Sequence, residues 1–151
     1  MQSDLRRYLT FYIGETPFCV RMDTVTSIDS LDVERLSQKR GVYLGTVGSS
    51  AGSVPLYHLW PILFGEEPPL TGGKMLVFKG KDVPLAVVAD AVGEVVEGEE
   101  ASWFSMPPIS GQKARGCFPG ALLRAGGPCL EVDPEAVRDR KSTRLNSSHP
   151  H

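Results

Sequence analysis

Residues 8–22, Tyr-Leu-Thr-Phe-Tyr-Ile-Gly-Glu-Thr-Pro-Phe-Cys-Val-Arg-Met, decide the fold class of this chain. Large apolar side chains occupy every second position before Gly14 and again after Pro17. A period of two is typical of a β-strand, and two such runs around a turn that contains glycine and proline indicate a hairpin. The stretch therefore predicts two antiparallel strands that share one apolar face.

Short apolar runs separated by turn residues continue along the rest of the chain. Residues 25–31 carry apolar side chains at a spacing of three, which fits a short helical turn and an irregular strand equally well. The polar residues 33–41 indicate an exposed connection, and residues 98–116 indicate irregular structure. Further strands are predicted at residues 42–47, 53–59, 75–79, 83–89, 91–97, 117–123 and 129–132.

Two short helices are predicted among these strands. Residues 60–65 place a proline near the first helical turn and Gly65 at the end. Residues 133–137 begin with Asp133 as N-cap and a proline at the first helical position. About nine or ten short strands with almost no long helical period predict an all-β fold of the sandwich or small-barrel type.

The length of 151 residues predicts one domain with one core or two small lobes. The Pro- and Gly-containing residues 66–73 are the best candidate for a connection between halves, since hairpins are predicted on both sides. We therefore expect a domain over residues 8–137, with a first lobe at about 8–65 and a second at about 74–133.

The last residues, 139–151, do not belong to this domain in our interpretation. Residues 139–149 match one reading frame of a common sequencing-library adapter, so we exclude them from the fold and expect the natural C-terminus to be missing. Without residues 139–151, 13 basic residues face 17 acidic ones, and His58 is the only histidine. A mildly acidic chain without a basic stripe argues against a nucleic-acid partner.

Other chemistries find little support in the sequence. Cys19, Cys117 and Cys129 are too far apart for a Cys-x-x-Cys ligand pair and are odd in number, so they indicate buried thiols in a reducing compartment. No apolar run approaches the roughly 20 residues that span a bilayer. We expect a cytoplasmic protein without direct membrane insertion, without a metal or cofactor, and without catalytic carboxylates.

The order of these features resembles the CheW family of chemotaxis coupling proteins. The resemblance begins with Phe11-Tyr-Ile-Gly14, Phe18-Cys-Val20 and Val25-Thr-Ser-Ile28. Residues 45–59, Gly-Thr-Val-Gly-Ser-Ser-Ala-Gly-Ser-Val-Pro-Leu-Tyr-His-Leu, align without gaps with the family pattern Gly-Val-x-Asn-Leu-Arg-Gly-x-x-x-Pro-Val-x-Asp-Leu. The first and last residues of this stretch and its proline agree with the pattern.

Several positions of that stretch depart from the family pattern. Ser50 stands where the family usually has Arg, Ala51 where it has Gly, and His58 where it has Asp. The loss of a planar guanidinium with five donors predicts a changed partner specificity. Residues 85–92 and 130–133 are similar to the strand ending in Asp-x-Val and to the terminal strand of the family, so the resemblance extends from about residue 8 to 137.

The resemblance implies two small SH3-like five-stranded barrels packed together, with short helices between them and at the C-terminus. It further implies a non-enzymatic adaptor that joins the cytoplasmic tip of a chemoreceptor to the regulatory domain of a chemotaxis histidine kinase. A receptor helix that docks by its apolar face needs apolar residues at the junction of the barrels. By motif position, the candidates for receptor or kinase binding are Val25, Ile28, Val47, Ser50, Val88 and Val92.

Two alternatives remain open at the level of sequence. The chain could be a CheW-like regulatory domain of a larger protein, either a kinase or a coupling protein fused to a receiver domain. Residues 48–52 also fit the Gly-x-Ser-x-Gly pattern of serine hydrolases, with Ser50 as nucleophile and His58 as base. A nucleophile elbow turns from a strand into a helix, whereas residues 53–59 predict another strand, which argues against hydrolysis.

Overall fold

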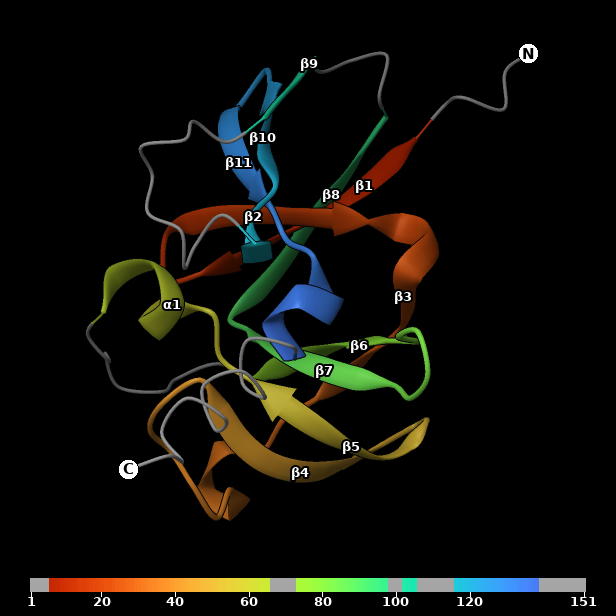
Figure 1. Ribbon diagram of the computed structural model, residues 1–151, viewed down its shortest axis with the longest axis vertical. Coiled ribbons are helices and arrows are strands. Elements are labelled where there is room, and N and C mark those ends of the chain that lie inside the picture. The colour runs from red at the N-terminus through yellow and green to blue at the C-terminus, as the bar shows by residue number, and fades with distance from the viewer. Residues whose placement is uncertain (1–5, 66–72, 98–101, 106–115, 139–151) are drawn as a thin grey trace, which may run out of the picture.

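A computed structural model describes residues 6–65, 73–97, 102–105 and 116–138 of the chain. These residues form two β-sheets joined by short helices, so the predicted all-β class is confirmed (Figure 1). Sheet A has the strand order β8-β1-β2-β11-β10-β9, and sheet B has the order β3-β6-β7-β5-β4. The strands of sheet A are β1 (Arg7–Ile13), β2 (Thr16–Arg21), β8 (Ala91–Glu97), β9 (Ser102–Ser105), β10 (Gly120–Arg124) and β11 (Gly127–Glu131). Those of sheet B are β3 (Val25–Ser30), β4 (Tyr43–Ser49), β5 (Gly52–Tyr57), β6 (Lys74–Phe78) and β7 (Leu85–Ala89).

The predicted first hairpin is confirmed in β1 and β2. The strands are antiparallel, with Leu9 opposite Val20 and Phe11 opposite Phe18. Both faces of this hairpin are buried, however, because Thr10 and Cys19 on the second face are also fully covered. The reason is topological: β1 and β2 lie in the middle of sheet A, which curls so that its second face encloses a small interior of its own.

The region left open at residues 25–31 is mainly a strand. A short 3-10 turn, η2 (Met22–Thr24), leads into β3, which pairs with β6. The register shifts between Val25 and Ser27, so Val25 lies opposite Phe78 and Ile28 lies opposite Leu76. A β-bulge of this kind places residues three apart on the same face of a sheet. The bulge therefore explains the spacing of three between Val25 and Ile28, whereas Leu31 follows the strand and belongs to the cluster of sheet B.

The two sheets do not correspond to the two halves of the sequence. Sheet B contains β3, β4 and β5 from before residues 66–72 and β6 and β7 from after them, while sheet A takes its strands from both ends of the chain. The expected lobes at residues 8–65 and 74–133 are therefore different sets of residues from the two sheets. The predicted connection at 66–73 lies, except for Gly73, outside the described residues.

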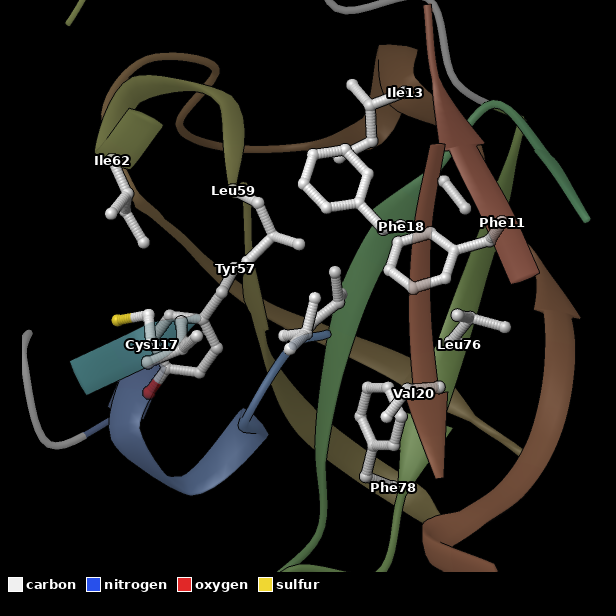
Figure 2. Packing of buried hydrophobic residues seen from close by; sticks show 14 of the residues in the cluster. Phe11, Ile13, Phe18, Val20, Tyr57, Leu59, Ile62, Leu76, Phe78 and Cys117 are labelled. Carbon is white, nitrogen blue, oxygen red and sulfur yellow. The ribbon is translucent and has the colours of Figure 1, made fainter. Parts of the chain in front are cut away.

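A shared hydrophobic core lies between the two sheets. Phe11 and Phe18 from sheet A stack with ring centroids 5.5 Å apart, and Leu76 and Phe78 from β6 belong to the same cluster (Figure 2). Each sheet also has a smaller cluster on its other face. The cluster of sheet B is formed by Leu31, Leu36, Leu44, Val54, Leu56, Met75, Val77, Ala86 and Val88. That of sheet A is formed by Tyr8, Cys19, Val96, Leu122 and Cys129.

Within the predicted irregular region at residues 98–116, the described residues 102–105 form a strand that the sequence did not reveal. Strand β9 pairs with β10 at the edge of sheet A and gives this sheet a sixth strand. The indole of Trp103 lies over Gly120, where a Cβ atom would collide with the ring and with the backbone oxygen of Phe104. Trp103 Nε1 also donates to Glu131 Oε1 at 2.5 Å. A glycine in β10 thus makes room for the edge strand.

Both predicted helices are present. Helix α1 (Trp60–Phe64) ends at Gly65, whose φ of 75° is a left-handed conformation that suits glycine. Residues 134–138 are helical, and the Asp133 carboxylate accepts from the backbone N–H of Glu135 at 3.1 Å, as predicted for an N-cap.

The C-terminal helix contacts the β6–β7 turn and so connects the end of sheet A to sheet B. Glu135 accepts from the backbone N–H of Lys81 at 2.5 Å and forms an ion pair with Arg138 at 2.7 Å. Arg138 in turn donates to the backbone oxygen of Val83 at 3.0 Å. We call this group, Glu135, Arg138 and the Lys81–Val83 backbone, the helix clamp.

The predicted non-native tail, residues 139–151, lies outside the described residues. Within the described part of the chain, no helix has the length and apolar character needed to cross a bilayer.

Candidate interaction surface

Strand β3 and the β4–β5 turn are far apart in the order of sheet B, yet polar contacts join them. The backbone N–H of Ser50 donates to Asp29 Oδ2 at 2.8 Å, and Ser50 Oγ lies 3.4 Å from Asp29 Oδ1. The hydroxyl of Ser27 lies 2.8 Å from that of Ser50. Since β3 and β4 are the two edge strands, these contacts draw the edges of sheet B together into a small barrel.

The carboxylate of Asp29 is the charged group in the contact between β3 and the β4–β5 turn. The backbone N–H of Ser50 is the main reason that its pKa lies below the ordinary value, and the hydroxyls of Ser27 and Ser50 lower the pKa further against a small opposing effect of burial. Among the described residues, no lysine or arginine lies within ion-pair distance of Asp29. Ser50, which stands where the family usually has Arg, thus places an uncharged side chain beside the carboxylate of Asp29.

The six predicted binding residues occupy different environments. Ile28 is 45% exposed, and Ser50 is exposed at the tip of the β4–β5 turn. Val25 and Val92 are half-buried against the shared core, and Val47 is half-buried against the cluster of sheet B. Val88 is 1% exposed in β7 and belongs to the interior of sheet B.

The structure brings some of these residues together and separates others. Val25 and Ile28 lie in β3, and the turn that contains Ser50 is hydrogen-bonded to this strand through Asp29. Val47 belongs to the same β4–β5 hairpin. Val92 lies in the other sheet and shares with Val25 only the core between the sheets. We call Ser27, Ile28, Asp29 and Ser50 the β3–turn surface, in which Ile28 and Ser50 are exposed and Ser27 and Asp29 are half-buried.

Asp29 and Ser27 are residues of this surface that the sequence analysis did not single out. Ser27 lies within the motif Val25-Thr-Ser-Ile28 and Asp29 directly follows it, but nothing in the sequence pairs them with a turn that lies 21 residues or more further along. Four of the six residues of β3 are polar, so polarity alone did not distinguish Ser27 and Asp29. Their contact partner, Ser50, comes near them only because the two edges of sheet B meet when the barrel closes.

The local structure at Ser50 is not a nucleophile elbow. Ser50 lies in a tight turn between two antiparallel strands, and the strand after it, β5, was predicted correctly. The hydroxyl contacts Ser27 and Asp29, whereas His58 is buried beyond the six residues of β5, which span on the order of 20 Å. Among the described residues, no cluster of His, Cys, Asp and Glu could hold a metal ion.

Comparisons with known proteins agree with this architecture. The family model described as "CheW-like domain" matches residues 7–141. The structure is similar to the crystal structure of the scaffolding protein TtCheW from Thermoanaerobacter tengcongensis, with a TM-score of 0.69 and 11% sequence identity over 87% of this chain and 86% of that one. No curated protein sequence matches the chain significantly.

The structural match covers both sheets and supports the expected pair of SH3-like barrels. At 11% identity it establishes the fold alone, while the family model carries the assignment of the sequence. Because this model spans most of the chain, from the first residue of β1 to residue 141, the protein belongs to the CheW-like domain family.

Proposed function

We propose that this chain is a non-enzymatic adaptor that couples chemoreceptors to a chemotaxis histidine kinase. The observation that carries the proposal is the match of the CheW-like family model to both barrels, residues 7–141. Membership in this family supports a role as a chemotaxis coupling adaptor in general. The specific partners, the cytoplasmic tip of a receptor and the regulatory domain of the kinase, are part of the proposal.

We place the contact with a partner at the β3–turn surface. Ile28 offers an exposed apolar side chain on an edge strand, and Asp29 and Ser50 form a polar border next to it. An apolar centre with a polar rim is the usual composition of a protein interface. Val25 is half-buried against the shared core and Val47 against the cluster of sheet B. We assign both of them, together with Val88 and Val92, to partner binding on the basis of motif position.

The serine at position 50, where the family usually has Arg, affects which partners this chain would bind. A partner that meets this chain finds the carboxylate of Asp29 and a serine hydroxyl in place of a guanidinium. A cationic side chain on the partner would be favoured at this point, since opposite charges steer and select interface partners. Through such partners the protein would be located in the cytoplasm, at membrane receptor arrays.

The proposal is tested by Ile28→Glu, with Leu123→Glu as the matched control. Leu123 lies on sheet A and is 46% exposed, so both changes introduce a charge at an equally exposed aliphatic residue. We expect Ile28→Glu to weaken binding to the receptor tip or the kinase regulatory domain at least about tenfold, which corresponds to about 1.4 kcal/mol. Binding is measured by titration calorimetry against each purified partner, and folding by circular dichroism.

The outcomes separate the two parts of the proposal. If folded Ile28→Glu binds as tightly as the control, the β3–turn surface is not the binding site. If the unaltered chain binds neither the receptor tip nor the kinase domain, the adaptor function itself is refuted. Val25→Glu is a less suitable variant, because Val25 packs against the shared core and a charge there threatens the fold.

The alternative is that the chain is the CheW-like regulatory domain of a larger protein. The same fold and surface would then act within a kinase or a receiver-fused coupling protein. Reading the source DNA beyond residue 138 distinguishes the two, since an open frame that continues into a further domain would favour the larger protein.

A further inference from the structure

The interior of sheet A contains two cysteines side by side. Cys19 in β2 is fully buried and Cys129 in β11 is 2% exposed, and both belong to the same small cluster. The Cys19 thiol donates to the backbone oxygen of Cys129 at a distance of 4.0 Å. Neither residue forms a disulfide, and the third cysteine, Cys117, is buried in the shared core.

A nearly buried arginine lies beside this pair. The Arg124 side chain is only 8% exposed, and its guanidinium folds back over Gly126, where a Cβ atom would collide with it. Its contact with a carboxylate, Glu94 in β8, is long at 3.5 Å. Arg124 Nε is buried and has no hydrogen-bond partner in the described residues.

The strand register places this cation next to Cys129. Arg124 lies opposite Gly127 in the β10–β11 pair, and Cys129 is two residues further along on the same face. Because Gly127 has no side chain, the guanidinium can reach diagonally towards Cys129, and it lies near enough to lower the pKa of that thiol. A buried cation with few partners is costly unless an anion compensates it.

We propose that Cys129 is held as a thiolate opposite Arg124 and is the cysteine of this chain that hydrogen peroxide oxidises. This inference is independent of the adaptor function. In the competing state, Cys129 is a neutral thiol that donates to the backbone oxygen of Leu122 across 3.8 Å. The two states differ in the charge of one sulfur atom, and therefore in its reactivity.

The ionisable groups around Cys129 come from five strands, β1, β2, β8, β10 and β11. The hydrogen bond from Cys19 and the nearby Arg124 lower the pKa of Cys129 to about 6, although burial opposes this change and Glu94 raises the pKa slightly. The same pairing raises the pKa of Cys19, which therefore stays protonated as the donor. The remaining ionisable side chains near this group are Tyr8 and Tyr12 in β1 and Glu131 in β11.

The proposed reaction needs no group beyond the peroxide. The thiolate of Cys129 attacks one peroxide oxygen, the S–O bond forms, and the O–O bond breaks. Sulfur loses two electrons, and the leaving hydroxide takes up a proton to become water. The product is a sulfenic acid at Cys129. Access requires transient opening of the β10–β11 hairpin, since buried thiols react slowly in a closed structure.

The three cysteines provide an internal comparison, because all are at most 2% exposed. The unaltered protein is treated at pH 6 with hydrogen peroxide and dimedone, which traps sulfenic acids, and each cysteine is quantified by peptide mass spectrometry. We expect Cys129 to be labelled about 20-fold faster than a cysteine of ordinary pKa, after allowing for the lower nucleophilicity of a weakly basic thiolate. Labelling of Cys129 at the rate of Cys19 and Cys117 overturns the proposal.

Two substitutions of Arg124 test the origin of the effect. Arg124→Gln removes the cation, and we expect labelling of Cys129 at pH 6 to fall severalfold and its pH midpoint to rise. Arg124→Lys keeps a positive charge and is expected to retain most of the labelling. If both variants label Cys129 as fast as the unaltered chain, Arg124 does not stabilise a thiolate and the assignment is wrong. The comparison within the unaltered protein stands even if a variant fails to fold.

Discussion

Sheet A and sheet B share one architecture but differ in what they enclose and in how the chain builds them. Sheet B uses only residues 25–89, and its inner cluster consists of Leu, Val, Met and Ala side chains. Sheet A combines the N-terminal hairpin with strands after residue 90, and its interior holds Thr10, two cysteines and most of Arg124. The comparison shows that a small barrel tolerates polar groups inside when neighbouring strands supply their partners.

A substitution in the shared core between the two sheets is expected to have the largest effect on stability. Phe18 is fully buried and its ring lies near those of Phe11 and Phe118, at centroid distances of 5.5 and 6.0 Å. Phe18→Ala is expected to cost about 3–5 kcal/mol, the usual range for a truncated core phenylalanine. Urea denaturation followed by tryptophan fluorescence and circular dichroism measures the change.

The number of unfolding transitions shows whether sheet A and sheet B unfold together. Because Phe18 joins the cores of both sheets, we expect the two probes to report one cooperative transition at lower urea. Two separated transitions would show that the sheets unfold independently. A loss below about 1 kcal/mol would contradict the central position of Phe18.

Two glycines distinguish the crowded edge of sheet A from the open edge of sheet B. A Cβ at Gly120 would collide with Trp103 and with the backbone of β9, whereas a Cβ at Gly48 in β4 meets no atom within 4 Å. Gly120→Ala is expected to destabilise the protein by about 1–3 kcal/mol and to displace β9. Gly48→Ala is expected to change the stability by less than about 1 kcal/mol.

The melting temperatures of the two alanine variants, together with the fluorescence of Trp103, check this expectation. A displaced β9 exposes the indole and shifts its emission to longer wavelength. Equal stabilities of the two variants would show that β9 does not hold the position described for it.

The helix clamp gives the smallest effect, and its signature is a dependence on pH. Burial alone would raise the pKa of Glu135, but the hydrogen bonds from Arg138 and from the Lys81 backbone outweigh it and lower the pKa below the ordinary 4.5. A carboxylate of lowered pKa stabilises the fold above 4.5, and this contribution is lost as the pH falls through the folded value. Glu135→Gln is therefore expected to cost about 1 kcal/mol at pH 7 and less at low pH.

Urea titrations of Glu135→Gln and the unaltered protein between pH 7 and pH 3 measure this difference. Asp23→Asn is the control, since it removes a surface ion pair with Arg21 in which the Asp23 side chain is 72% exposed, and such pairs contribute about 0.5 kcal/mol or less. A difference between Glu135→Gln and the unaltered chain that stays constant down to pH 3 would contradict the role of the ionised carboxylate.

Most of the fold could be predicted from the sequence because its strands are short, alternating and bounded by turn residues. The first hairpin, helix α1 and the N-cap at Asp133 all depend on neighbours close in sequence. Two features escaped prediction for physical reasons. Strand β9 is an edge strand whose four residues are exposed and therefore lack a buried face to alternate with. The bulge in β3 imitates a helical spacing.

The candidate site was less predictable, because its composition depends on how the sheets close. Motif position singled out Val88 as a contact, yet this residue lies inside sheet B, since alternation cannot tell which face of a doubly buried strand points outward. Asp29 was not singled out, because its contact with Ser50 arises only where the edges of sheet B meet. The assignment of the six residues to binding remains a prediction.

The mixed origin of sheet A has a consequence for the biosynthesis of the protein. β1 and β2 are translated first, yet two of their neighbours, β8 and β11, follow about 70 to 120 residues later. All strands of sheet B are translated in between, so that sheet can form while the N-terminal hairpin still lacks its neighbours. Contacts between distant segments slow folding, and the parallel pairing of β2 with β11 joins residues more than 100 positions apart. Completion of sheet A is therefore expected to be the late and slow step of folding. Until then the β1–β2 hairpin lacks its neighbouring strands, so it is the segment most in need of protection from aggregation.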